Sequence, residues 1–149
     1  MGEATIKLAG KSIDTKLNAE AHHYQIISDE PVSLGGKGEA PNPMEYLLMA
    51  YAGCLNALSR YYIDLKGLEV REMFLEVHGK FNTDKLKLRE TTKRAGFEYI
   101  NVSIEFDTDE PIEKIEEIVK MVKEGCPMHD NITNPTPTII DYKIKDMGE

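Results

Sequence analysis

The chain has no apolar stretch long enough to cross a bilayer. Its longest nearly apolar run is residues 46–58, whereas a spanning helix needs about 20 residues. We therefore expect a buried helix there and no membrane association. Residues 1–17 contain no apolar run of signal-peptide length, so we expect a cytoplasmic protein.

Positive charge is scarce. The sequence has 18 basic and 26 acidic residues and a net charge of −8, which repels phosphate at long range. We therefore expect no nucleic-acid partner. One segment, residues 82–96, is locally basic, but no aromatic residue alternates with its basic residues for base stacking. We interpret it as a solvated hairpin tip, and nucleic-acid binding there is the alternative. Its basic residues are Lys85, Lys87, Arg89, Lys93 and Arg94.

Several cofactor and catalytic motifs are absent. The glycine-rich loop at 33–38 lacks the phosphate-loop pattern, and no Gly-x-Ser-x-Gly hydrolase motif occurs. Cys126 and His129 have the spacing of half a zinc site, but no second half follows. Only a coincidence of folding would bring Cys54 and the adjacent pair His22 and His23 close enough to complete that zinc site. We expect neither a metal nor a cofactor.

The sequence has only two cysteines, Cys54 and Cys126. In a reducing compartment a structural disulfide is disfavoured, which leaves core packing, redox chemistry or metal binding. Cys54 lies on the apolar face of the expected helix, where a buried cysteine is often inert. Cys126 precedes Pro127, a pattern typical of a helix N-cap, where free N–H groups stabilise thiolate over thiol. From position alone, neither cysteine can be assigned as inert or as reactive.

Apolar periodicity predicts an α+β fold in one domain, residues 1–149. Asn42 and Pro43 are a good N-cap and first position for a long helix, and Gly67 is a good C-cap. Helices should pack against a mainly antiparallel sheet. The expected elements are strands at 5–8, 13–17 and 22–28, a helix at 43–66, strands at 73–81 and 100–106, a helix from about 111 to 125, a turn or short helix at 127–131 and a strand at 140–144.

Three segments together resemble the OsmC-like proteins, which include the organic hydroperoxide reductases. These are Ser28-Asp-Glu-Pro-Val-Ser-Leu-Gly-Gly, the helix Ala40-Pro-Asn-Pro-Met-Glu-Tyr-Leu-Leu-Met-Ala-Tyr-Ala-Gly-Cys54, and Gly125-Cys-Pro. The resemblance extends along the whole chain in element order and is densest at residues 28–60.

The resemblance implies an intertwined homodimer with paired central helices and each active site at the subunit interface. Cys54 would attack an organic hydroperoxide and become a sulfenic acid, and Cys126 would condense with it to a disulfide. A dithiol reductant would then reopen the bond. The implied role is peroxide removal in oxidative or osmotic stress defence.

The sequence departs from the hydroperoxide reductases at two positions. Their N-terminal arginine, which pairs with a helical glutamate to hold the first cysteine as thiolate, has no counterpart before Arg60. Counting back from Cys54, the glutamate of the hydroperoxide reductases falls at Met44. Glu45, one residue later, is the candidate acid, although its side chain is rotated by about 100° around the helix from that position. Lys37 or a residue of a second subunit are candidate replacements for the cation. The alternative function is a dimeric, redox-inert or redox-sensing protein that binds a small apolar ligand.

Overall fold

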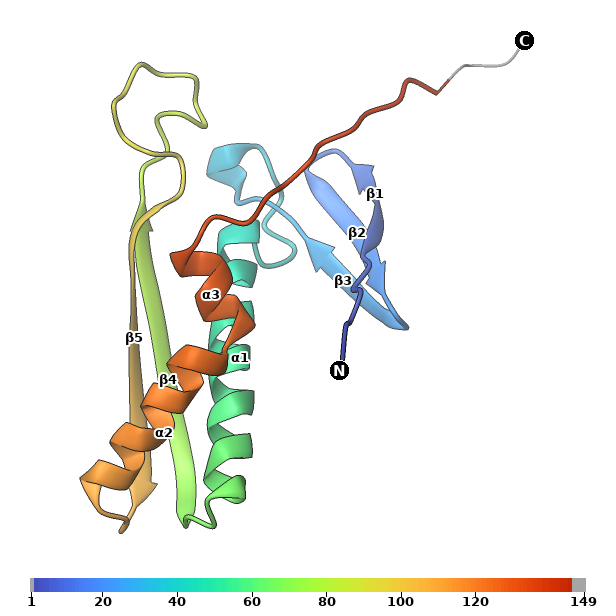
Figure 1. Ribbon diagram of the computed structural model, residues 1–149. Coiled ribbons are helices and arrows are strands. Elements are labelled where there is room, and N and C mark those ends of the chain that lie inside the picture. The colour runs from blue at the N-terminus through green and yellow to red at the C-terminus, as the bar shows by residue number, and fades with distance from the viewer. Residues whose placement is uncertain (1, 146–149) are drawn as a thin grey trace.

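The computed structural model describes residues 2–145 and has two antiparallel sheets (Figure 1). Strands β1 (Ala9–Ile13), β2 (Lys16–Ala21) and β3 (Tyr24–Ser28) form a three-stranded sheet in the order β1-β2-β3. Strands β4 (Val70–Phe81) and β5 (Phe97–Thr108) form a long hairpin in which Val77 faces Val102. The predicted α+β class with antiparallel sheets is confirmed.

A short 3-10 helix, η1 (Val32–Leu34), and three α-helices complete the fold of residues 2–145: α1 (Pro43–Leu65), α2 (Ile112–Gly125) and α3 (Pro127–Thr133). The long central helix was predicted almost to the residue, because its end signals act as expected. The Asn42 side chain accepts hydrogen bonds from the N–H groups of Met44 and Glu45, and Gly67 has a left-handed φ of 64°. In Figure 1, α1 stands between the N-terminal sheet and the β4–β5 hairpin, and α2 lies beside α1 along that hairpin.

The first two predicted strands are wrong in position. Residues 5–8 form no strand, and residues 13–17 contain the turn between β1 and β2, at which Asp14 has a φ of 54°. The predicted strand at 140–144 is also wrong, since residues 139–145 form no strand and Ile140, Tyr142 and Ile144 are exposed. In Figure 1 this segment extends away from the helices.

A buried carboxylate fixes the loop that leads into α1. Asp29 is 1% exposed and accepts hydrogen bonds from the Thr15 hydroxyl and the backbone N–H groups of Glu30, Lys37 and Glu39. Burial works to raise the pKa of Asp29, but the hydrogen bonds from Thr15, Glu30 and Lys37 and the positive charge of Lys16 outweigh it and hold the pKa below its usual value. The glycine-rich segment is therefore an ordered loop around a carboxylate.

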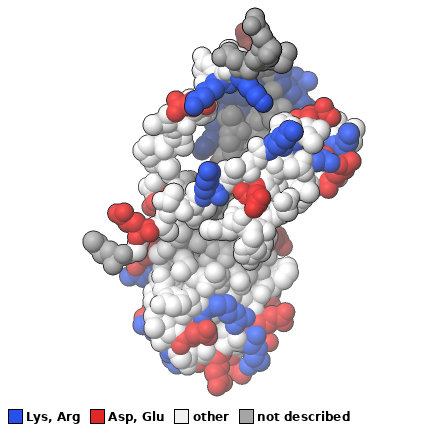
Figure 2. Space-filling view, turned by 90° about the vertical axis from the view of Figure 1, so that its right-hand side faces the viewer, with Lys and Arg blue, Asp and Glu red and all other residues white. Residues whose placement is uncertain are grey.

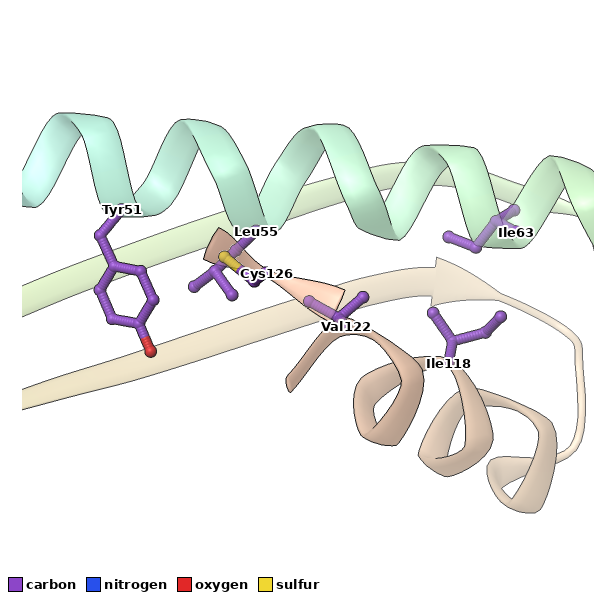
Figure 3. Packing of buried hydrophobic residues seen from close by; sticks show 6 residues of the cluster. All are labelled: Tyr51, Leu55, Ile63, Ile118, Val122 and Cys126. Atoms are coloured by element: carbon purple, nitrogen blue, oxygen red, sulfur yellow. The ribbon is translucent and has the colours of Figure 1, made fainter. Parts of the chain in front are cut away.

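The core lies between α1, α2 and the β4–β5 hairpin. Figure 3 shows Ile63 of α1 opposite Ile118 of α2 and Leu55 of α1 beside Val122, while Tyr51 lies further along the same side of α1. The apolar faces of the two helices meet in this cluster. Cys126 belongs to the same cluster, so the end of α2 is held against the middle of α1.

The packing at α2 predicts a large stability effect. Ile118 is fully buried, so Ile118→Ala should lower the free energy of unfolding by about 2–5 kcal/mol through lost burial and a cavity. Urea unfolding at one fixed protein concentration measures it. Ile112→Ala is the matched control, since Ile112 lies on the same helix and is 64% exposed. Equal losses in both variants would contradict this account of the core.

Candidate active site

The two cysteines, 72 residues apart in the chain, lie next to each other. The Cys126 thiol is in hydrogen-bonding contact with Cys54, with 2.8 Å between the sulfur atoms. Both cysteines are free thiols. A disulfide has an S–S length of about 2.05 Å, so a small approach of the two side chains would allow bond formation.

Helix α1 positions Cys54 at its middle, and the junction of α2 and α3 positions Cys126. Cys126 is extended (φ −80°, ψ 111°) between the two helices and caps both. Its backbone N–H donates to the Val122 carbonyl, and its sulfur accepts a hydrogen bond of 3.3 Å from the backbone N–H of His129. The predicted N-cap geometry of Cys126 is confirmed.

The two sulfurs differ in accessibility and in environment. Cys126 is 1% exposed, whereas Cys54 is partly exposed. Burial raises the pKa of the Cys54 thiol, and the hydrogen bond with Cys126 raises it further, although a backbone N–H of Met128 acts in the opposite direction. A solute would therefore reach Cys54 first and would meet it mainly as a thiol at neutral pH.

A tyrosine and a histidine are hydrogen-bonded to each other beside the cysteines. The Tyr51 hydroxyl and His129 Nδ1 are 2.7 Å apart, and the two rings are stacked. Burial, together with charge on Cys126 and Cys54, raises the pKa of Tyr51, so its hydroxyl stays neutral. Sequence reasoning missed this pair. The available signal was spacing, because Tyr51 precedes Cys54 by three residues and His129 follows Cys126 by three.

Two cavities meet at Tyr51 and His129. One, of about 270 Å³, lies between α1, β5 and α2 and has a largely apolar lining that includes Leu55, Val102 and Val122. The other, of about 550 Å³, lies between the start of α1, the residues around the start of β5 and α3, and Arg94 and Glu98 line it. Both cavities are large enough to admit small organic molecules beside Tyr51 and His129.

Glu45 and Lys37, the candidate charged residues of the sequence analysis, have other contacts in this chain. The Glu45 carboxylate accepts from the Asn42 backbone N–H at 2.8 Å and completes a capping box. It lies nine residues before Cys54, about 13 Å along the helix axis. Lys37 lies in the loop around Asp29. A role of either residue at the sulfurs remains a prediction.

Within residues 2–145, no group of three or more His, Cys, Asp or Glu side chains is arranged to hold a metal ion. The His129 ring contacts Tyr51, as described above. In the same residue range, no helix combines the length and the apolar character needed to cross a membrane.

Solved structures with the same fold show what the chain is similar to. An OsmC-like protein from Mycoplasma pneumoniae is 21% identical with a TM-score of 0.73, over 90% of this chain and 89% of that one. An organic hydroperoxide resistance protein OsmC from Legionella pneumophila is 18% identical with a TM-score of 0.66, over 89% of this chain and 91% of that one. An organic hydroperoxide resistance protein from Elizabethkingia anophelis, with thiocyanate bound, is 14% identical with a TM-score of 0.67, over 90% of this chain and 91% of that one.

At these identities the structural likeness establishes the fold alone. No curated protein matches the sequence. The family model described as OsmC-like protein matches residues 36–141, which include α1, both cysteines and the β4–β5 hairpin. This match covers well over half of the chain and confirms the resemblance seen in the sequence. The chain belongs to the OsmC-like protein family.

Proposed function

We propose that the protein is a thiol-dependent peroxidase that reduces organic hydroperoxides in oxidative or osmotic stress defence. The observation that carries the proposal is the contact of 2.8 Å between the sulfurs of Cys54 and Cys126. Family membership supports it, as do the names of the Legionella pneumophila and Elizabethkingia anophelis proteins as organic hydroperoxide resistance proteins. We expect it to act in the cytoplasm without a metal or cofactor.

Cys54 is the proposed nucleophile because it is the more accessible sulfur. Its thiolate attacks the distal peroxide oxygen, the O–O bond breaks, and the sulfur loses two electrons to become a sulfenic acid. The alkoxide takes a proton and leaves as an alcohol. Cys126 then attacks the Cys54 sulfur, an S–S bond replaces the S–O bond, and water leaves. A dithiol reductant returns two electrons by thiol–disulfide exchange.

The test counts thiols against peroxide. Reduced protein is titrated with cumene hydroperoxide in the absence of reductant, and free thiols are measured after unfolding. We expect two thiols to be lost for each peroxide consumed, with an intramolecular disulfide as the product. If the thiol count is unchanged after excess peroxide, the peroxidase proposal is wrong.

We further propose a homodimer formed through the free face of α1. Apolar side chains of this helix are exposed, with Met49 at 68%, Tyr61 at 60% and Leu65 at 63%. Figure 2 views the molecule from the side of the N-terminal sheet and shows a largely uncharged region between charged ends. Gly53 adjoins Cys54 on this helix, and a Cβ there would meet no atom of residues 2–145 within 4 Å apart from those of its neighbours in the chain and of the backbone of its own helix. A second copy packed at Gly53 would enclose Cys54.

A substitution at Gly53 tests the dimer. Gly53→Leu adds a side chain to open space within the single chain, so the subunit should still fold. In the dimer the same side chain would separate the two helices, and we expect light scattering to show a shift towards monomer. Glu124→Leu on the exposed side of α2 is the control. A wild-type protein that is monomeric at every concentration would contradict the proposal.

A second candidate function is binding of a small apolar ligand by a redox-inert dimer. The raised pKa of Cys54 and the apolar cavity of about 270 Å³ favour it. Native mass spectrometry of the purified protein distinguishes the two. A retained ligand, together with thiols that do not react with peroxide, would support binding over catalysis.

A further inference from the structure

The Tyr51–His129 pair has no part in the mechanism above, yet it occupies the same junction as the two sulfurs. Tyr51 is on α1, three residues before Cys54, and His129 is on α3, three residues after Cys126. The backbone of His129 donates to the Cys126 sulfur, and its ring bonds to the Tyr51 hydroxyl. Through His129 the hydrogen-bonded pair is therefore connected to the sulfur pair.

Closing the disulfide requires a proton acceptor and then a proton donor. The Cys126 thiol must lose its proton to become nucleophilic, and the hydroxide that leaves Cys54 must gain one. Cys126 is 1% exposed, so bulk water has little access to its proton. A group inside the protein is needed to accept it.

Tyr51 and His129 have the properties of such a group. Tyr51 is only 7% exposed, and the charges of both sulfurs act on its hydroxyl. Both residues line the cavities of about 270 Å³ and 550 Å³. Imidazole changes its charge near neutral pH, whereas a phenol hydroxyl can pass a proton on and remain neutral. The pair thus lies between the buried Cys126 sulfur, which the His129 backbone contacts, and two spaces large enough for water.

We propose that Tyr51 and His129 form a proton relay for disulfide closure between Cys54 and Cys126. This inference rests on the proposed peroxidase function. The Tyr51 hydroxyl gives its proton to His129 Nδ1 and receives the Cys126 proton, directly or through one water. Cys126 then attacks the Cys54 sulfenic acid, and the proton returns from His129 through Tyr51 to the departing hydroxide. The products are the disulfide and water, and both relay residues end as they began.

The charged and titratable groups around His129 come from several elements and set the pH dependence of the relay. They are Tyr51 on α1, Cys126 at the start of α3, Lys123 on α2, Arg94 in the β4–β5 loop and Glu98 on β5.

Two conservative variants separate a relay from a structural role. His129→Asn keeps a hydrogen-bonding group near the position of Nδ1 but cannot titrate, and Tyr51→Phe keeps the ring in the core. The measurement is the rate at which the Cys54 sulfenic acid, trapped with dimedone at successive times, is converted to disulfide. General acid–base groups contribute about a hundredfold or more, so we expect about a hundredfold slower closure in either variant.

The pH profile is the readout that a structural role would not change. We expect closure in the wild type to rise with pH, and His129→Asn should change the shape of that profile. His78→Asn, an identical substitution at an exposed site on β4, is the control. Closure at the wild-type rate with an unchanged profile in both relay variants would overturn the proposal.

Diamide separates failure of the relay from failure of the peroxidase function, because it oxidises two neighbouring thiols to a disulfide without peroxide. If the wild type ignores peroxide but closes quickly with diamide, and both variants close slowly, the relay stands and the peroxidase proposal is wrong. If the variants close at the wild-type rate with diamide and with peroxide, the relay is wrong.

Discussion

Replacing Cys54 by serine should abolish peroxide consumption, with a rate about a thousandfold or more below that of the wild type. A serine hydroxyl stays protonated at neutral pH and cannot attack the O–O bond as a thiolate does. The Cys126 thiol remains, but it is buried and out of reach of a solute. The measurement is loss of cumene hydroperoxide in the presence of a dithiol reductant.

Cys126→Ser is the matched variant, because serine is itself a good N-cap and should keep α3 folded. Here Cys54 should still react once and then accumulate as a sulfenic acid that mass spectrometry detects as one added oxygen. One thiol, not two, should be lost per peroxide, and further peroxide should carry the sulfur on to sulfinic acid. Undiminished turnover in this variant would show that Cys126 does not resolve the sulfenic acid.

The parts of the fold that sequence predicts well are those whose signals are local. Helix α1 has an N-cap at Asn42 and a left-handed glycine at Gly67, and its apolar stripe leaves little freedom in its register. The hairpin strands β4 and β5 alternate apolar and polar residues and pair with each other. In each case the information lies within the segment or in its immediate neighbour in the chain.

The strand predictions failed where pairing decides the structure. Residues 13–17 look like a strand by composition, but Asp14 adopts a left-handed turn that lets β1 pair with β2. Ile140, Tyr142 and Ile144 alternate as in a strand, yet no strand among residues 2–145 pairs with them and they are exposed. Alternation shows which side chains share a face, whereas a strand also needs a partner for its backbone groups.

In the candidate site, too, local features are predictable from the sequence and contacts between distant segments are not. Local sequence predicts that Cys126 caps a helix, and the structure confirms it. Composition and spacing do not predict that Cys54 lies 2.8 Å from Cys126, since 72 residues separate them. The family resemblance supplied that pairing. The contact between Tyr51 and His129 arises because α3 packs on α1, and neither residue carries a motif of its own.

The pH dependence of the first chemical step should also be large. The pKa of the Cys54 thiol is raised by burial and by the hydrogen bond with Cys126, so only a small fraction is thiolate at neutral pH. Because the thiolate is the nucleophile, the rate should grow about tenfold per pH unit below the pKa, or about a thousandfold from about pH 6 to about pH 9. The rate should still be rising at neutral pH, since a raised pKa moves the pH range in which Cys54 is fully thiolate to more alkaline values.

Stopped-flow mixing of reduced wild-type protein with less than one equivalent of hydroperoxide measures this step as loss of peroxide, since the O–O bond breaks before the disulfide closes. The Cys54→Ser protein supplies the background at each pH. A rate that is already constant between about pH 6 and about pH 8 would mean that Cys54 is fully ionised there. A cation close to Cys54 would then have to hold the thiolate.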